Sequence, residues 1–413
     1  MLDPYAAWRY PEFRAFVTTQ FFYTLAVLIQ EIAVSYYLYE LTGNALSLGL
    51  VGLFEAIPYI TLALFGGHLA DLYDKRIIAQ ICFVIVALCT GWLIWATHPD
   101  TGLSSEQQTW SIYASVFVFG ASRGFYNPAW SSLKPFLVKP EHYANSASWS
   151  TQIWQTGVIV GPASGGFLYA YLGLTHTLWV VGGLLLLVLV SANFIQRRKL
   201  PPTPKQPLRE SLSEGFRFVT THKIMLYALI LDMFSVLFAG VIAILPVFAK
   251  DILHVGPEGL GLLRAAPSVG AVVSMIGTAY FPPIRQAWRN MLIAVTGFGV
   301  ATLVFGLSTH FYLSLVALAF TGIFDGISVV IRSTILQILP PDHLRGRVSS
   351  VNGIFVSCSN ELGAFESGLA ATLVGTVPSV VLGGMVTLGV VAYIYWKSKD
   401  LFGIQLIQIN ERT

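Results

Sequence analysis

Charged side chains fall inside long apolar stretches of this sequence, where ionisable residues are uncommon, and seven of them are candidates for function. They are Glu31, Glu55, Arg123, Asp232, Asp325, Glu361 and Glu366. An ionisable group away from water is costly unless it is paired or has a task, so each is a candidate for binding a proton or a polar substrate. A carboxylate that alternates between a cationic partner and an apolar setting can take up a proton and release it again. The chemistry these residues suggest is reversible protonation and ion pairing.

The partners of these charges cannot be read from the sequence, but some pairings can be proposed. We expect Arg123 to pair with Glu31, and the alternative is a static ion pair that only packs helices. Asp232 has no opposite charge within its own segment, so it is either a titratable group or hydrogen-bonded to a nearby serine or tyrosine. We expect Arg264 and Arg332 to lie nearer the segment ends and to extend their guanidinium groups to water.

The segments that carry these residues have the composition of membrane-spanning helices. The chain has 413 residues, of which 55% are hydrophobic and only 11% charged, whereas soluble proteins are about 25% charged. A spanning helix needs roughly 20 apolar residues. The predicted spans are 12–38, 45–70, 77–97, 110–136, 144–171 and 176–196, then 223–249, 258–282, 289–309, 311–338, 347–373 and 377–396. We therefore predict an all-α integral membrane protein with twelve transmembrane helices.

A polar, proline-rich stretch divides these helices into two sets of six. We predict an N-terminal bundle at 1–196, a cytoplasmic linker at 197–221 and a C-terminal bundle at 222–413. The later part of the linker has helical apolar spacing and is expected to form an amphipathic connector. Most of the 24 lysines and arginines fall on one side if both termini are cytoplasmic, as the positive-inside rule requires. The bases are thus explained by topology, and no nucleic-acid partner is expected.

The two predicted halves carry similar short motifs at corresponding places. Pro140-Glu141-His142 follows the fourth span, and Pro341-Asp342-His343 follows the tenth; within those spans, Gly120-x-x-Arg123-Gly124 corresponds to Gly322-x-x-Asp325-Gly326. Parallel repeats of this kind face each other across a central cavity in transporters that work by alternating access. The layout favours that mechanism.

The stretch after the second span resembles the signature of the major facilitator superfamily, G-x-L-A-D-R-x-G-R-[RK]. It matches at Gly67, Leu69, Ala70, Asp71, Lys75 and Arg76, and it differs at Leu72 and Asp74. The resemblance covers essentially the whole chain and implies a twelve-helix transporter. It also implies that Gly67, Asp71, Lys75 and Arg76 form a conformational switch between access states.

A second stretch, in the fifth span, is similar to the G-x-x-x-G-P-x-x-G-G motif of drug and proton antiporters. Its matching residues are Gly157, Gly161, Pro162, Gly165 and Gly166. Glycines at four-residue spacing make a flat helix face, so a general packing face is the alternative. Looser similarities at 39–43, 245–249 and 259–267 resemble the branch that includes bacterial enterobactin exporters. They imply efflux of a siderophore-like or amphipathic compound.

Several other classes of function lack their sequence patterns. The sequence contains no G-x-x-x-x-G-K-[ST], His-Glu-x-x-His or Cys-x-x-Cys, so we expect no enzyme activity, no cofactor and no metal. We predict a proton-coupled exporter in the inner (plasma) membrane, acting on a small molecule as a monomer among membrane lipids. The alternatives are a lipid or lysophospholipid transporter and a membrane sensor of the same fold that does not transport.

Overall fold

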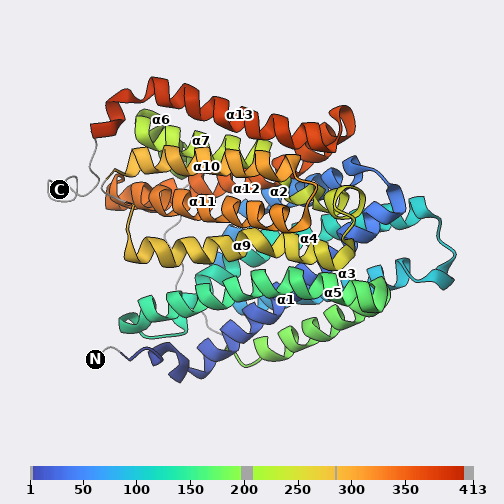
Figure 1. Cartoon of the computed structure of the whole chain (residues 1–413). Coiled ribbons are helices and arrows are strands. Elements are labelled where there is room, and N and C mark those ends of the chain that lie inside the picture. Colours follow the sequence, from blue (N-terminus) through green and yellow to red (C-terminus); the bar gives the residue numbers. More distant parts are fainter. Residues whose placement is uncertain (1–2, 197–207, 284–285, 404–413) are drawn as a thin grey trace. The chain divides into compact units, whose positions relative to one another are not determined.

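The computed structural model describes residues 3–196, 208–283 and 286–403, and this part of the chain consists of helices joined by short turns, with no β-strand (Figure 1). It divides into two compact units. Unit 1 comprises Met1–Thr203 with His254–Ala265, and unit 2 comprises Pro204–Leu253 with Ala266–Thr413.

Unit 1 contains five long helices, and three of them begin at a residue whose side chain caps the helix. The five are α1 (Pro11–Thr42), α2 (Ala45–Leu72), α3 (Lys75–Ala96), α4 (Ser105–Leu133) and α5 (Tyr143–Ala192). The Asn44 side chain accepts a hydrogen bond from the Leu46 amide at the start of α2, and Ser104 forms a reciprocal capping box with Gln107 at the start of α4. Such caps satisfy amides that have no partner within the helix.

Helix α5 consists of two spans joined at a single glycine. Gly173 has φ of 72° and ψ of 177°, a conformation that glycine adopts readily and that interrupts the helical path. The predicted boundary between the fifth and sixth spans lies at this position.

Unit 2 contains the remaining helices. They are α6 (Leu208–Thr221), α7 (Lys223–Ala239), the short α8 (Leu245–Val247), most of α9 (Gly256–Tyr280), α10 (Ala287–Leu307), α11 (Phe311–Ile338), α12 (Asp342–Val374) and α13 (Thr376–Lys397). The first ten residues of α9, to Ala265, belong to unit 1.

The described residues confirm the predicted membrane fold. Nine of their helical segments are long and apolar enough to cross a membrane, including 223–252, which joins α7 to α8. Helices α4 and α12 are also long enough, at 29 and 33 residues, although they carry more polar side chains. With α5 counted as two spans, the arrangement has the twelve spanning helices expected from the sequence.

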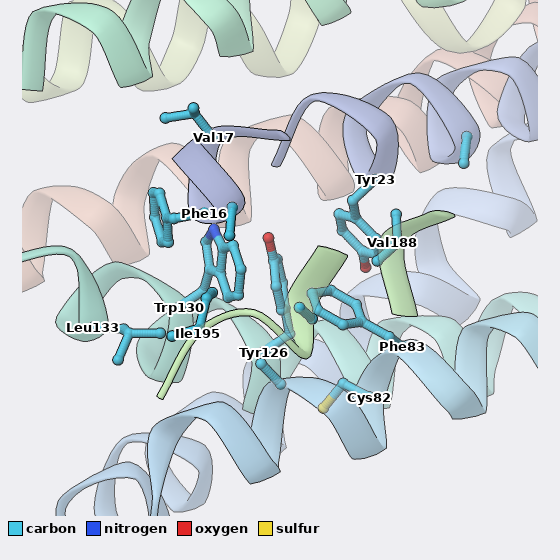
Figure 2. Packing of buried hydrophobic residues seen from close by; sticks show 14 of the residues in the cluster. Phe16, Val17, Tyr23, Cys82, Phe83, Tyr126, Trp130, Leu133, Val188 and Ile195 are labelled. Atoms are coloured by element: carbon cyan, nitrogen blue, oxygen red, sulfur yellow. The ribbon is translucent and has the colours of Figure 1, made fainter. Parts of the chain in front are cut away.

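Each unit has its own apolar core. In unit 1, α1 lies along α5. Aromatic rings from α1, α3 and α4 pack against one another (Figure 2). Phe16 stacks on Trp130 with ring centroids 4.4 Å apart, and Tyr23 contacts Tyr126 at 4.7 Å and Phe83 at 5.1 Å. Because these side chains are buried against one another, they form a packed core and not a cavity. In unit 2 the buried Trp288 anchors the second core.

The linker helix α6 packs against α12. Glu214 forms an ion pair with Arg347 of α12, and Val219 is completely buried. A Cβ on Gly215 would lie 2.8 Å from the Arg347 carbonyl oxygen, so a larger residue at this position would push the two helices apart. The predicted helix is thus present, with Val219 in the apolar core of unit 2 and Phe216 exposed.

Candidate functional site

The stretch Gly67–Arg76 forms the end of α2, a two-residue turn and the start of α3. The α2 helix continues through Asp71 and ends at Leu72, further than the sequence suggested. Asp74, one of the two departures from the family signature, caps α3 by accepting a hydrogen bond from the Arg76 amide at 2.9 Å. An aspartate at this position also favours the positive end of the α3 dipole. The departure is therefore compatible with the turn.

The basic residues of this stretch bind backbone and side-chain oxygens on neighbouring segments. The Lys75 ammonium is buried and donates to the Ala70 carbonyl oxygen at 2.7 Å. The Arg76 guanidinium donates to both the backbone and side-chain oxygens of Asn193, just after α5, at 3.0 and 3.1 Å. Asp71 is exposed at the end of α2. The turn therefore connects the ends of α2, α3 and α5.

The glycine-rich stretch of α5 packs mainly against α1. A Cβ on Gly157 would lie 3.0 Å from Thr24, one on Gly161 would lie 2.8 Å from Leu28, and one on Gly165 would lie 3.0 Å from Ile29. Gly166 instead faces the beginning of α9, where it meets Gly261, and the carbonyl of Pro162 also faces Gly261. The predicted flat packing face is thus present, because these approaches leave no room for larger side chains.

In unit 1, Arg123 of α4 pairs with Glu55 of α2. The guanidinium lies 2.5 Å from the Glu55 carboxylate, and its carbon lies 4.6 Å from the centroid of the Tyr59 ring. The approach depends on Gly120, one turn earlier in α4, whose missing Cβ would otherwise meet the Glu55 backbone carbonyl. The expected pair of Arg123 with Glu31 is therefore wrong.

Glu31 has a different partner, Arg264 near the beginning of α9. The Arg264 side chain is only 17% exposed, so the expectation that it extends freely to water is also wrong. The neighbouring glycine contact between α5 and α9 allows the first turns of α9 to come within reach of α1. Glu31 and Arg264 form a neutral pair when both are charged.

Unit 2 contains the most deeply buried charges. Asp232 of α7 forms an ion pair with Arg332 of α11, and both residues are 6% exposed. The expectation that Arg332 snorkels to water is therefore wrong, and Asp232 has a charged partner from another helix. Asp325 lies near the middle of α11 and makes no ion pair or hydrogen bond with another described residue. When all three are ionised, the group carries one excess negative charge.

Asp232 and Asp325 line the same small pocket in unit 2. The pocket has a volume of about 10 Å³, room for about one water-sized group, and it is lined by Asp232, Ser235, Val236, Val295, Phe298, Phe324, Asp325 and Ser328. Sequence reasoning missed the two serines and the pairing of Arg332. A signal was present: Arg332 follows Asp325 by seven residues, which is two helical turns and places both on one face.

The two remaining candidate acids, Glu361 and Glu366, lie on α12. Both are partly exposed, and neither lines the pocket of Asp232 and Asp325. The other five candidates thus belong to three groups: Arg123 with Glu55, Glu31 with Arg264, and Asp232 and Asp325 with Arg332.

Pairs of glycines flank Arg123 and Asp325 in their respective helices. In α4, Gly120 and Gly124 flank Arg123 and face the α2 backbone. In α11, Gly322 and Gly326 flank Asp325 and face α9. The motif similarity seen in the sequence therefore corresponds to the same kind of helix packing. In both units a charged side chain projects from a helix held close to its neighbour.

Comparison with known proteins agrees with this architecture. The sequence profile described as "Major Facilitator Superfamily" matches residues 16–364. The chain belongs to the Major Facilitator Superfamily. It is a multi-pass membrane transporter and not an enzyme, and its relatives include efflux pumps.

Two relatives and one solved structure illustrate the similarity. The multidrug efflux pump Tap of Mycolicibacterium fortuitum is 26% identical over 87% of this chain and 89% of its own. The enterobactin exporter EntS of Citrobacter koseri is 24% identical over 92% of this chain and 90% of its own. A bacterial homologue of the human lysosomal transporter Spinster, in an inward-facing and unoccupied conformation, has a TM-score of 0.71 at 16% identity, covering 95% of this chain and 98% of that one. The last similarity concerns the fold alone.

Proposed function

We propose that this transporter is a proton-coupled exporter of a small amphipathic or siderophore-like compound. Its relatives include proteins named as a multidrug efflux pump and an enterobactin exporter. We further propose that two six-helix halves, at 1–196 and 222–413 with a linker at 197–221, rock around a central site. In this proposal the protein acts as a monomer in the inner membrane, surrounded by lipid, with both termini in the cytoplasm.

The observation that carries the proton coupling is the buried group of Asp232, Arg332 and Asp325. An uncompensated charge within a membrane span is costly. One guanidinium against two carboxylates leaves one negative charge, and the uptake of a single proton neutralises the group. The group is therefore suited to accept one proton when it is open to the acidic side and to release it when Arg332 is better placed to compensate both acids.

The charged pairs of unit 1 have a different role in this proposal. Arg123 with Glu55 and Arg264 with Glu31 are each neutral without a proton. Such a pair supports coupling when substrate or a conformational change separates its members, because the released carboxylate then becomes a proton acceptor. Asp71 and the rest of its stretch act as the conformational switch, and the glycines of α5 provide the close packing that one access state requires.

Purified protein in liposomes tests this proposal. With enterobactin and a fluorescent amphipathic dye as probes, we expect uptake or release against the probe gradient when a pH difference is imposed. Asp232→Asn and Arg123→Ala should each reduce pH-driven transport by about tenfold or more, a loss of about 1.4 kcal/mol in the rate-limiting step. Asp100→Asn, which removes a carboxylate that is 89% exposed, is the matched control and should transport normally.

Three results would contradict the proposal. Transport that is indifferent to the pH difference removes the proton coupling. Movement of lipid or lysophospholipid without a proton gradient favours the lipid-transporter alternative. Saturable probe binding without any flux in sealed vesicles favours a sensor that does not transport.

A further inference from the structure

The pocket in unit 2 is built from the same four-residue pattern on two helices. Helix α7 carries Asp232-Met-Phe-Ser235, and α11 carries Asp325-Gly-Ile-Ser328. Residues three apart lie on the same face of a helix, and all four side chains line the pocket. Two carboxylates and two hydroxyls, from two helices, therefore face one small space.

Ser328 shows that the pocket contains an unused ligand atom. Ser328 is only 4% exposed and makes no hydrogen bond with any other residue in the described part of the chain. Ser235, in contrast, donates to the Leu231 carbonyl oxygen at 2.5 Å, which leaves its lone pairs directed elsewhere. An oxygen-seeking ligand in the pocket would satisfy Ser328 and use the free lone pairs of Ser235.

The chemistry and charge of the pocket define that ligand. Carboxylate and hydroxyl oxygens are preferred by hard cations. With Arg332 paired to Asp232, the site carries one net negative charge, so a monovalent ion neutralises it and a divalent ion would leave a buried positive charge. The other walls are Val236 of α7, Val295 and Phe298 of α10, and Phe324 of α11. These apolar walls and the small volume exclude a hydrated ion and an organic cation.

We propose that this pocket binds a dehydrated monovalent metal cation of the size of Na⁺, in competition with the coupling proton. The inference rests on the proposed function in one respect, since it assigns a second ion to the group proposed to carry the proton. Asp325 supplies the ionised oxygen, Ser328 and Ser235 supply hydroxyl oxygens, and Asp232 remains paired with Arg332. A proton on Asp325 removes the charge that holds the cation, so the two ions exclude each other.

Equilibrium binding of radioactive Na⁺ to the purified full-length transporter tests this site, with choline as the inert cation. We expect saturable binding at pH 8 that weakens as the pH falls. Asp325→Asn should reduce Na⁺ affinity by at least about tenfold and Ser328→Ala by about three- to tenfold, because each removes a ligand oxygen. Ser333→Ala is the matched control on the same helix. The Ser333 hydroxyl donates a hydrogen bond to the carbonyl oxygen of Val330 in α11, and Ser333 does not line the pocket.

A second measurement does not depend on the variants folding. If Na⁺ binds the native wild-type protein, NaCl should raise its melting temperature relative to choline chloride, and the difference should shrink at low pH. Absence of saturable Na⁺ binding at pH 8, or binding that Asp325→Asn and Ser328→Ala leave unchanged, overturns the cation site. If the site fails while pH-driven transport persists, the proton coupling stands alone. If Na⁺ binds and a pH difference drives no transport, the cation site stands and the proton coupling falls.

Discussion

Replacing one member of the buried ion pair in unit 2 should have very different consequences from replacing the other. With all groups ionised, Asp232, Asp325 and Arg332 sum to one negative charge. Asp232→Asn leaves Arg332 with Asp325 and a net charge of zero. Arg332→Gln leaves two carboxylates lining one pocket with no cation. The same ion pair is broken in both variants, but only the second leaves buried charge uncompensated.

The magnitude follows from the burial of the two side chains, which are 6% and 7% exposed. Removing one partner of a buried pair destabilises a protein by about 3–5 kcal/mol when the other charge remains unpaired. We expect a loss of this size in the free energy of unfolding for Arg332→Gln. For Asp232→Asn we expect about 1–3 kcal/mol, the cost of an impaired hydrogen bond, because Asp325 is available to the guanidinium.

Unfolding of the purified protein by denaturant in mixed micelles, at pH 8 and pH 5.5, measures this difference. The penalty of Arg332→Gln should be smaller at pH 5.5, because protonation of either acid removes the repulsion between them. The exposed Arg289→Gln serves as the control and should change stability little at either pH. A greater loss in the free energy of unfolding for Asp232→Asn than for Arg332→Gln would refute the charge reasoning. A loss for Arg332→Gln that is the same at pH 8 and pH 5.5 would also refute it.

Two further predictions concern positions outside this pocket. Gly270→Ala should lower the free energy of unfolding by about 1–3 kcal/mol, because the added Cβ would overlap the Ala319 carbonyl. Gly277→Ala, in open space on the same helix, is the control and should leave the free energy of unfolding unchanged or slightly higher. Equal losses for the two variants in denaturant unfolding would contradict this packing argument. Asp71→Asn should slow transport while leaving substrate affinity nearly unchanged, since Asp71 is exposed at the end of α2. Binding and initial-rate measurements separate the two quantities, and a large loss of affinity with normal turnover would show that the stretch has a different role.

The positions of the helices could be predicted closely from the sequence. The apolar run predicts the tenth span at 311–338, and α11 is Phe311–Ile338. This agreement arises because a spanning helix must satisfy its backbone hydrogen bonds internally and must be long enough to cross the apolar layer. The apolar run and its polar flanks therefore contain most of the information. The extension of α2 through Asp71 differs because a helix can continue beyond the membrane without an apolar sequence.

The partners of the charges could not be predicted in the same way. Spacing along one helix gives the depth and face of a residue, but the neighbour on another helix depends on how closely the two backbones approach. Arg123 reaches Glu55 because Gly120 allows α4 to contact α2 at that level. For Arg332, the seven-residue step from Asp325 was a usable signal, and it would have argued for a shared buried face instead of a position exposed to water.

The glycines that flank Arg123 and Asp325 also affect the rate at which these charges can change partners. Gly124 and Gly322 let their helices lie against the neighbouring backbone itself, and a contact between backbones has no side chain that can rotate to permit sliding. We expect a new pairing at either charge to arise by rotation of the charged side chain. Side-chain rotation occurs in picoseconds to nanoseconds when unhindered, and collective helix motions take microseconds to milliseconds. In the proposed rocking mechanism we therefore expect the charges to change partners faster than the helices move, so that helix movement limits the rate of transport.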